Sequence, residues 1–130
     1  MKNGLAEIPN MIYVWRMSYE VRIIKQAQDF IAEMETKLRA RVFWVIGLLE
    51  DMGPFLGEPY SKKIQDQKGL HELRIQSGNL GCRLFYFHSR ESVYIVASGF
   101  MKKQQKTPRR EIDRAMKLMK QYQEENLGKS

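Results

Sequence analysis

The stretch GLHELRI, residues 69–75, decides the fold together with CRLFYF at residues 82–87 and GFMKK at residues 99–103. Short apolar runs of this kind predict β-strands, and the two lysines open a basic loop. Arginine is unusual inside such strands because a guanidinium group is costly to bury. Its planar shape suits the binding of phosphate, so the strand arginines are candidates for a functional site.

Three strands are predicted at residues 70–76, 82–87 and 93–97. Polar turns at residues 77–79 and 89–92 separate them. Short turns join neighbouring strands that run in opposite directions, so the sequence predicts an antiparallel meander.

The residues before this meander predict a strand and then a helix. β-Branched and aromatic residues indicate a strand at 12–17. Ser18 is expected to cap a helix, because apolar residues recur at helical spacing from Val21 to Met34.

A second helix is predicted to begin near Thr36 and to end at Gly53-Pro54. Phe43 and Trp44 lie partly outside its apolar stripe, and we expect them to pack between elements rather than to stack on RNA. A last helix is predicted to open with Thr107 as its cap and Pro108 at its first position. The resulting order, β-α-α-β-β-β-α, predicts an α+β domain with an antiparallel sheet, two N-terminal helices on one face and a C-terminal helix.

A length of 130 residues fits one domain, which we place at 12–125, with a flexible extension at 1–11 and a loose tail at 126–130. No apolar run approaches the roughly 20 residues of a membrane span. The start of the chain lacks the pattern of a secretory signal. Cys82 is the single cysteine, so no internal disulfide can form, and a reducing cytoplasm is the expected location.

The net charge of +7 is concentrated in the strand-rich part of the chain. Residues 60–114 carry 12 Lys and Arg against 5 Asp and Glu, whereas residues 1–59 carry 7 against 8. A local basic surface attracts polyanions, of which nucleic acid is the commonest. A solvated face that aids solubility is the alternative, and arginines within strands count against it.

Side chains alternate along the first strand of the meander. His71, Leu73 and Ile75 are expected to face the core. Glu72 and Arg74 are expected to lie side by side on the open face, where an ion pair contributes little to stability.

Arg83 lies in a strand that is apolar on both faces, so we expect it to be partly buried in mid-sheet. A buried arginine needs a partner. Either an internal carboxylate such as Glu72 or a ligand phosphate would serve, and the sequence favours neither.

Further basic residues flank the strands and surround the start of the last helix. Basic residues at a helix N-terminus oppose its dipole, and an anion bound between them would offset that cost. The candidates for binding RNA or the ribosome are Lys62, Lys63, Lys102, Lys106, Arg109 and Arg110.

No metal and no cofactor is expected. His71 and His88 are the only histidines, and with one cysteine they form no set with the spacing of zinc ligands. His71 is expected to pack in the core, whereas His88 could act as an acid or base. The sequence contains no glycine-rich phosphate loop and no dinucleotide fingerprint.

The chain resembles the RelE/HigB superfamily of toxins, in its phage-derived HigB-like branch, from about Trp15 to Tyr122. The resemblance implies a ribosome-dependent messenger RNA endonuclease that works in the decoding site without a metal. In that reaction the ribose 2′-OH attacks the adjacent phosphate. It also implies a cognate antitoxin, expected to be a small helix-turn-helix protein. The most specific matches are residues 59–63, 69–75, 83–87 and 99–103, followed by Thr107-Pro108.

By this resemblance, Arg74 and Arg83 match functional strand positions, and Lys102 and Lys103 match the basic pair after the third strand. Arg83 is expected to stabilise the phosphate, and the other three to position RNA or act beside it.

The general acid and base are not identified. Several relatives place a histidine or tyrosine near the last helix, but none stands between Met101 and Gln121 here. Glu72, or a lysine of lowered pKa such as Lys103, could serve as the base. A non-catalytic ribosome- or RNA-binding inhibitor and a phage regulatory protein therefore stay open as alternatives, although no helix-turn-helix pattern supports DNA binding.

Overall fold

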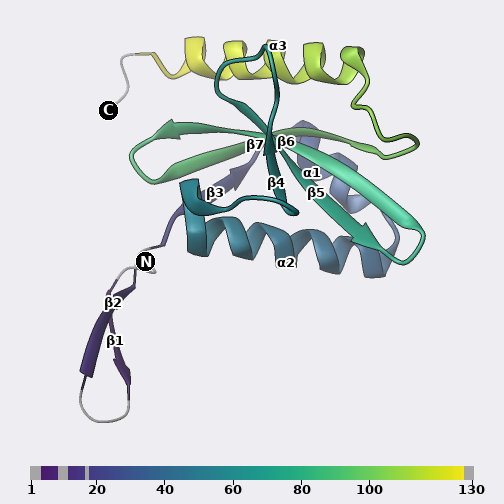
Figure 1. Cartoon of the computed structure of the whole chain (residues 1–130). Helices are drawn as coiled ribbons and strands as arrows, with labels where there is room; N and C mark the ends of the chain where they lie inside the picture. The colour runs from purple at the N-terminus through teal and green to yellow at the C-terminus, as the bar shows by residue number, and fades with distance from the viewer. Residues whose placement is uncertain (1–3, 9–11, 17, 128–130) are drawn as a thin grey trace.

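The computed structural model describes residues 4–8, 12–16 and 18–127, the first two ranges by their backbone alone. Five strands form the main sheet in the order β3-β7-β6-β5-β4, and β1 and β2 form a separate two-stranded sheet (Figure 1). The strands are β1 (Gly4–Ile8), β2 (Ile12–Arg16), β3 (Glu20–Ile23), β4 (Ser61–Lys63), β5 (Leu70–Ser77), β6 (Leu80–Arg90) and β7 (Val93–Met101). The helices are α1 (Lys25–Ala32), α2 (Thr36–Met52), the short 3-10 helix η1 (Gly53–Phe55) and α3 (Arg109–Glu125).

The predicted antiparallel meander is confirmed as β5, β6 and β7. A two-residue turn joins β5 to β6, and Gly78 in it has a φ of 58°, which glycine adopts without strain. All three strands are longer than predicted, because pairing continues beyond the apolar runs on which the prediction rested.

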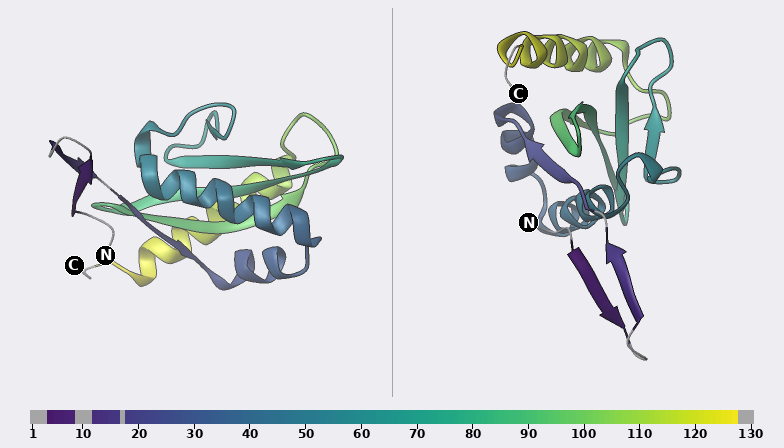
Figure 2. Two further views of the ribbon diagram at one scale, coloured as in Figure 1. Left: turned by 90° about the horizontal axis from the view of Figure 1, so that it is seen from below. Right: turned by 90° about the vertical axis from the view of Figure 1, so that its left-hand side faces the viewer.

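Helices cover both faces of the sheet (Figures 1 and 2). α1 and α2 pack with Leu73 and Leu84 on one face, whereas α3 packs with Phe85 and Phe87 on the other. The α+β architecture is as predicted, but the expectation of an open second face is wrong where α3 covers it. None of the helices in the described ranges is long and apolar enough to cross a membrane.

The helix expected directly after Ser18 is wrong in its first part. Residues 20–23 form β3, which runs parallel to β7, and α1 begins only at Lys25. The N–H of Glu20 donates to the carbonyl of Ser92 at 2.8 Å. Pairing at the sheet edge satisfies the backbone here and overrides the helical spacing of the apolar residues.

The chain ends are described only in part. The strand predicted at 12–17 is confirmed over β2, while Met17 lies outside the described residues. The extension predicted at 1–11 contains β1, and its residues 1–3 and 9–11 lie outside the description. Residues 128–130 of the predicted tail also lie outside the description. The division into extension, domain and tail stays a prediction.

Candidate functional site

A buried carboxylate organises the sheet face that carries α3. Glu72 on β5 is 1% exposed and accepts hydrogen bonds from three side chains. Arg83 Nη1 donates to its Oε2 at 2.6 Å, and Arg74 Nε donates to the same oxygen at 2.9 Å. Thr107 Oγ1 donates to Oε1 at 2.9 Å. These four residues are called the Glu72 cluster below.

The sheet register explains how the two arginines meet one carboxylate. Arg74 lies directly opposite Arg83 across β5 and β6, so both side chains leave the same face. Glu72 precedes Arg74 by two residues and shares that face. The ion pair of Glu72 and Arg74 was expected on the surface, but the carboxylate is buried beneath the arginine, which is 28% exposed.

The Glu72 cluster carries a net positive charge, because two guanidinium groups share one carboxylate. Burying the charges of Glu72 and Arg83 costs several kcal/mol per ion unless hydrogen bonds compensate, and both groups make such bonds here. The sequence left two partners open for Arg83, an internal carboxylate or a ligand phosphate. In the structure Arg83 is 5% exposed and pairs with the carboxylate of Glu72.

Arg83 nevertheless keeps donors for a ligand. A guanidinium has five N–H groups. Among the described residues, the carboxylate of Glu72 is the one side-chain acceptor that pairs with Arg83. Arg83 lines a cleft, so the small part of its surface that stays exposed, about 5%, faces any anion bound there together with the surplus charge.

Thr107 does not cap α3, contrary to the prediction. Pro108 is the N-cap, without a side-chain hydrogen bond, and α3 begins at Arg109. Leaving a buried carboxylate oxygen without a partner costs more free energy than leaving exposed helix N–H groups to water. The Thr107 hydroxyl therefore bonds to Glu72 and not to the start of α3. The bond to Glu72 ties residues 102–107 to β5.

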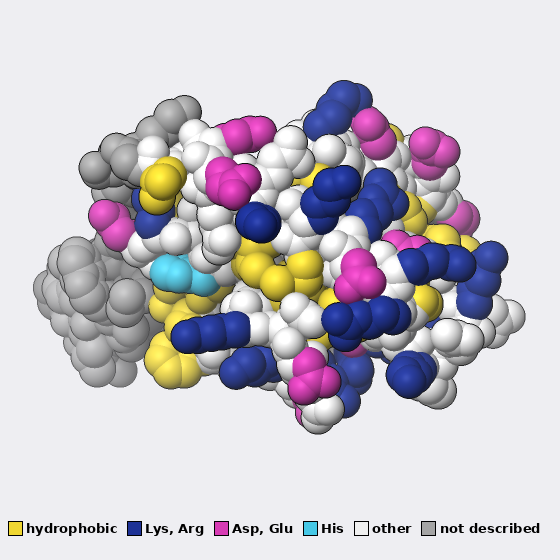
Figure 3. All heavy atoms as spheres, turned by 90° about the horizontal axis from the view of Figure 1, so that it is seen from above, with side chains coloured by type: hydrophobic (Ala, Val, Ile, Leu, Met, Phe, Trp, Pro, Cys, Tyr) yellow, Lys and Arg dark blue, Asp and Glu magenta, His cyan; other side chains and the backbone are white. Residues whose placement is uncertain are grey.

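Two clefts meet at Arg74 and Gln105, which line both. The arginine cleft has a volume of about 370 Å³, and its basic residues are Arg41, Arg74, Arg83 and Lys102. The lysine cleft has a volume of about 440 Å³, and its basic residues are Lys62, Lys63, Arg74, Lys106 and Arg109. Glu72 and Thr107 form part of its wall. On the face seen from above, Lys and Arg side chains gather on the half away from the grey residues (Figure 3).

The structure does not bring Lys103 to Arg83. Lys103 and Arg110 line a separate cleft with Phe100, whereas Lys102 shares the arginine cleft with Arg83. The N–H of Lys102 bonds to the carbonyl of Gly81, which continues the ladder beyond β7. Successive side chains in extended backbone point to opposite sides, so the two lysines diverge.

Arg41 on α2 is a basic residue of the arginine cleft that sequence reasoning missed. Its guanidinium carbon lies 4.0 Å from the centre of the Trp44 ring. Residues three apart are neighbours on a helix surface, so the spacing of Arg41 and Trp44 is the signal that could have found it.

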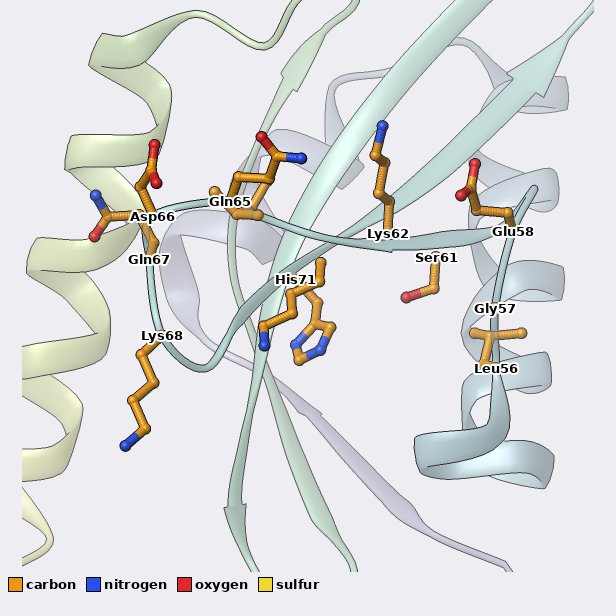
Figure 4. Close-up of a pocket in the computed structure, with 12 residues that line it drawn as sticks. Leu56, Gly57, Glu58, Ser61, Lys62, Gln65, Asp66, Gln67, Lys68 and His71 are labelled. Carbon is orange, nitrogen blue, oxygen red and sulfur yellow. The ribbon is translucent and has the colours of Figure 1, made fainter.

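A further cleft follows β4 and the loop after it at the edge of the sheet, and it shares the wall formed by residues 62–66 with the lysine cleft. It has a volume of about 980 Å³ and includes Ser61, Lys68 and His71 in its wall (Figure 4). His71 was expected to pack in the core, but it is half-buried at this cleft and stacks on Tyr86. Its Nδ1 is buried and has no hydrogen-bond partner among the described residues. Burial of the ring lowers the pKa of His71.

Other reactive side chains lie away from the Glu72 cluster. Burial raises the pKa of the Cys82 thiol to about 12, which leaves it protonated and unreactive at neutral pH. His88 lies at the opposite end of β6, with Nε2 2.6 Å from the carbonyl oxygen of Glu91. Among residues 4–8, 12–16 and 18–127, no group of three or more His, Cys, Asp and Glu could hold a metal ion.

Comparison with known proteins matches the family described as Phage derived protein Gp49-like to residues 29–120. Among solved structures, a double arginine-to-alanine mutant of the E. coli toxin RelE in the free state is similar, with a TM-score of 0.56 and 15% sequence identity. The similarity covers 81% of this chain and 98% of that chain. No curated protein matches the sequence. At 15% identity the structural likeness concerns the fold, whereas the family match spans more than half of the chain.

Proposed function

The chain belongs to the phage-derived Gp49-like family, a family of RelE/HigB type, and on that premise we propose that it is a ribosome-dependent messenger RNA endonuclease, the toxin of a toxin–antitoxin pair. The family match and the RelE fold confirm the resemblance drawn from the sequence. The observation that best supports the activity is the Glu72 cluster, whose two arginines carry its positive charge to the wall of the arginine cleft.

The reaction is cleavage by the RNA itself. A base takes the proton of the ribose 2′-OH, and the oxygen attacks the adjacent phosphorus. The bond from phosphorus to the 5′ oxygen breaks, and an acid protonates that leaving oxygen. Negative charge develops on the phosphate oxygens, where fixed positive groups stabilise it.

Arg83 and Arg74 are the residues we assign to that phosphate. Arg83 is fixed by a bond to a buried carboxylate, so little entropy is lost when it binds. Lys102 lies beside them and is a better candidate for contact with the reacting nucleotide than Lys103.

Glu72 acts as a positioning residue in this proposal. Its Oε2 already accepts two hydrogen bonds and its Oε1 accepts one, so neither oxygen is well placed to take a proton from RNA. The lysine cleft, with Lys62, Lys63, Lys106 and Arg109, would hold flanking RNA or ribosomal RNA. The separate cleft with Lys103 and Arg110 would hold ribosomal RNA.

The cognate antitoxin, which the family implies, would cover these clefts with an acidic segment. The lysine and arginine clefts supply the complementary charge. We expect the affinity to fall as salt rises, because rim charges are screened.

Induced expression with mapping of messenger 5′ ends tests the activity. Wild type should arrest growth and produce cuts at a fixed position within codons, and Arg83→Ala should lose both. Arg90→Ala, at the exposed end of the same strand, is the matched control and should behave as wild type. Arg83→Lys keeps the charge beside Glu72, so a folded Arg83→Lys protein without activity would exclude misfolding as the cause.

Inhibition by occupancy of the ribosome is the second candidate. Two observations favour it, because each removes a candidate acid or base. Glu72 already accepts hydrogen bonds on both oxygens, and His88 lies near the far end of β6 from Arg83. Growth arrest with intact messenger would support it over the endonuclease.

A further inference from the structure

Trp44 is the exposed aromatic residue that adjoins the arginine cleft. It lies on α2 and is 47% exposed. Its ring meets that of Tyr60 edge to face, with centroids 5.6 Å apart. Tyr60 and Arg41, which contact the Trp44 ring, both line the arginine cleft.

The packing role expected for Trp44 accounts for only part of its surface. Tyr60 is partly buried against the core and supports one edge of the indole. Arg41 lies over the ring, and no carboxylate among the described residues pairs with it. Arg41 and Trp44 hold each other in place while about half of Trp44 stays exposed, so together they form an aromatic, positively charged surface.

We propose that Trp44, Tyr60 and Arg41 form a platform that binds one unpaired RNA base beside the phosphate held by Arg83 and Arg74. The inference rests on the proposed function and adds a determinant of substrate position to it. Bases of single-stranded RNA stack on aromatic rings and on guanidinium planes, and both kinds of surface are present here. The neighbouring charges of Arg74, Arg83 and Lys102 would hold the backbone of the same strand.

Phe43 provides an internal control. It precedes Trp44 on α2 and is 52% exposed, so the two residues present similar apolar surface to solvent. Phe43 does not line the arginine cleft, and no ring or cation contact holds it among the described residues. Loss of exposed apolar surface alone would therefore affect both positions alike.

The test measures binding of a short single strand of 2′-O-methyl ribonucleotides, which cannot be cleaved through a 2′-OH. The chain has two tryptophans, so Trp15→Phe leaves Trp44 as the only one. Saturable quenching of its fluorescence on titration at low salt is expected. Because the Trp44 variants lack this signal, binding of all variants is measured by the anisotropy of a fluorescent label on the same strand. Trp44→Ala should weaken binding about tenfold, a loss typical of one stacked base. Phe43→Ala should change the dissociation constant less than twofold, and Trp44→Phe should retain most of the affinity.

An abasic site in the probe identifies the stacked base. At one position it should weaken binding to wild type about tenfold and should have no further effect on Trp44→Ala. Equal effects of Trp44→Ala and Phe43→Ala would overturn the inference, as would an absence of quenching by the probe. Fluorescence that depends on protein concentration but not on RNA would also overturn it, and would indicate a contact between copies of the chain. If Arg83→Ala still abolishes cleavage in these cases, the platform fails while the proposed function stands.

Discussion

The two faces of β5 differ in how far their polar groups are satisfied. On one face Glu72 is fully buried and accepts three side-chain hydrogen bonds. On the other face His71, its neighbour in sequence, leaves Nδ1 buried and unpaired among the described residues. The cleft that includes His71 has more than twice the volume of either basic cleft, but the Glu72 face has positive charge fixed by a buried carboxylate. For an anionic substrate, charge held in a fixed position matters more than the volume of a cleft.

The largest effect is expected for Glu72→Ala. The change leaves Arg83 buried without its carboxylate, and the free energy of unfolding should fall by about 3–5 kcal/mol. Urea denaturation measures it. Glu58→Ala is the matched control, because Glu58 is 68% exposed and lies 3.9 Å from Arg74. It should cost about 0–1 kcal/mol. Similar losses in the two variants would mean that the buried carboxylate is not the anchor of this face.

A smaller effect is expected for Thr107→Val, which keeps the shape of the side chain and removes the hydroxyl. One oxygen of Glu72 would lose its partner, at a cost of about 1–3 kcal/mol. Hydrogen exchange of residues 102–107 should become faster, because their tie to β5 is gone. Thr36→Val, at the exposed start of α2, should stay within about 0.5 kcal/mol of wild type. Unchanged exchange in Thr107→Val would show that this bond does not hold the loop.

The smallest effect concerns pH and the His71 face. Burial, with a contribution from Lys63, lowers the pKa of folded His71 below its unfolded value of about 6.5. The unfolded chain then binds more protons, so stability should fall as pH drops through about 6.5 towards the folded pKa. His71→Gln should flatten this dependence between pH 7 and pH 5 when urea unfolding is compared. An unchanged slope would mean that His71 titrates alike in both states.

The strands of the meander and α2 followed from the sequence because their patterns are local. β3 did not, because Val21 and Ile24 fit a helical period as well as a strand, and only the edge of β7 decides between them. β4 is three residues long and includes two lysines, so its strand character comes entirely from pairing with β5.

The site was predictable in its residue types but not in its arrangement. The sequence indicated Arg83 and Glu72 as possible partners, and the register of β5 and β6 brings them together. Thr107 could not be assigned, since its bond to Glu72 joins residues 35 positions apart. Arg41 was missed because its helix was assigned to the core from its apolar stripe. Its place in the arginine cleft also depends on Tyr60, which is distant in sequence and lines the same cleft.

Cleavage of ribosome-bound messenger by Arg74→Gln and Lys68→Gln tests most directly whether the Glu72 face acts on RNA. Arg74 lines both basic clefts, whereas Lys68 lines the larger cleft that contains His71. Arg74→Gln should slow cleavage by about 100-fold, the loss typical of one donor to a developing oxyanion. Lys68→Gln should stay within about twofold of wild type, since a single exposed charge contributes little. An equal or greater loss in Lys68→Gln would place the chemistry at the cleft that contains His71 and contradict the assignment to the Glu72 cluster.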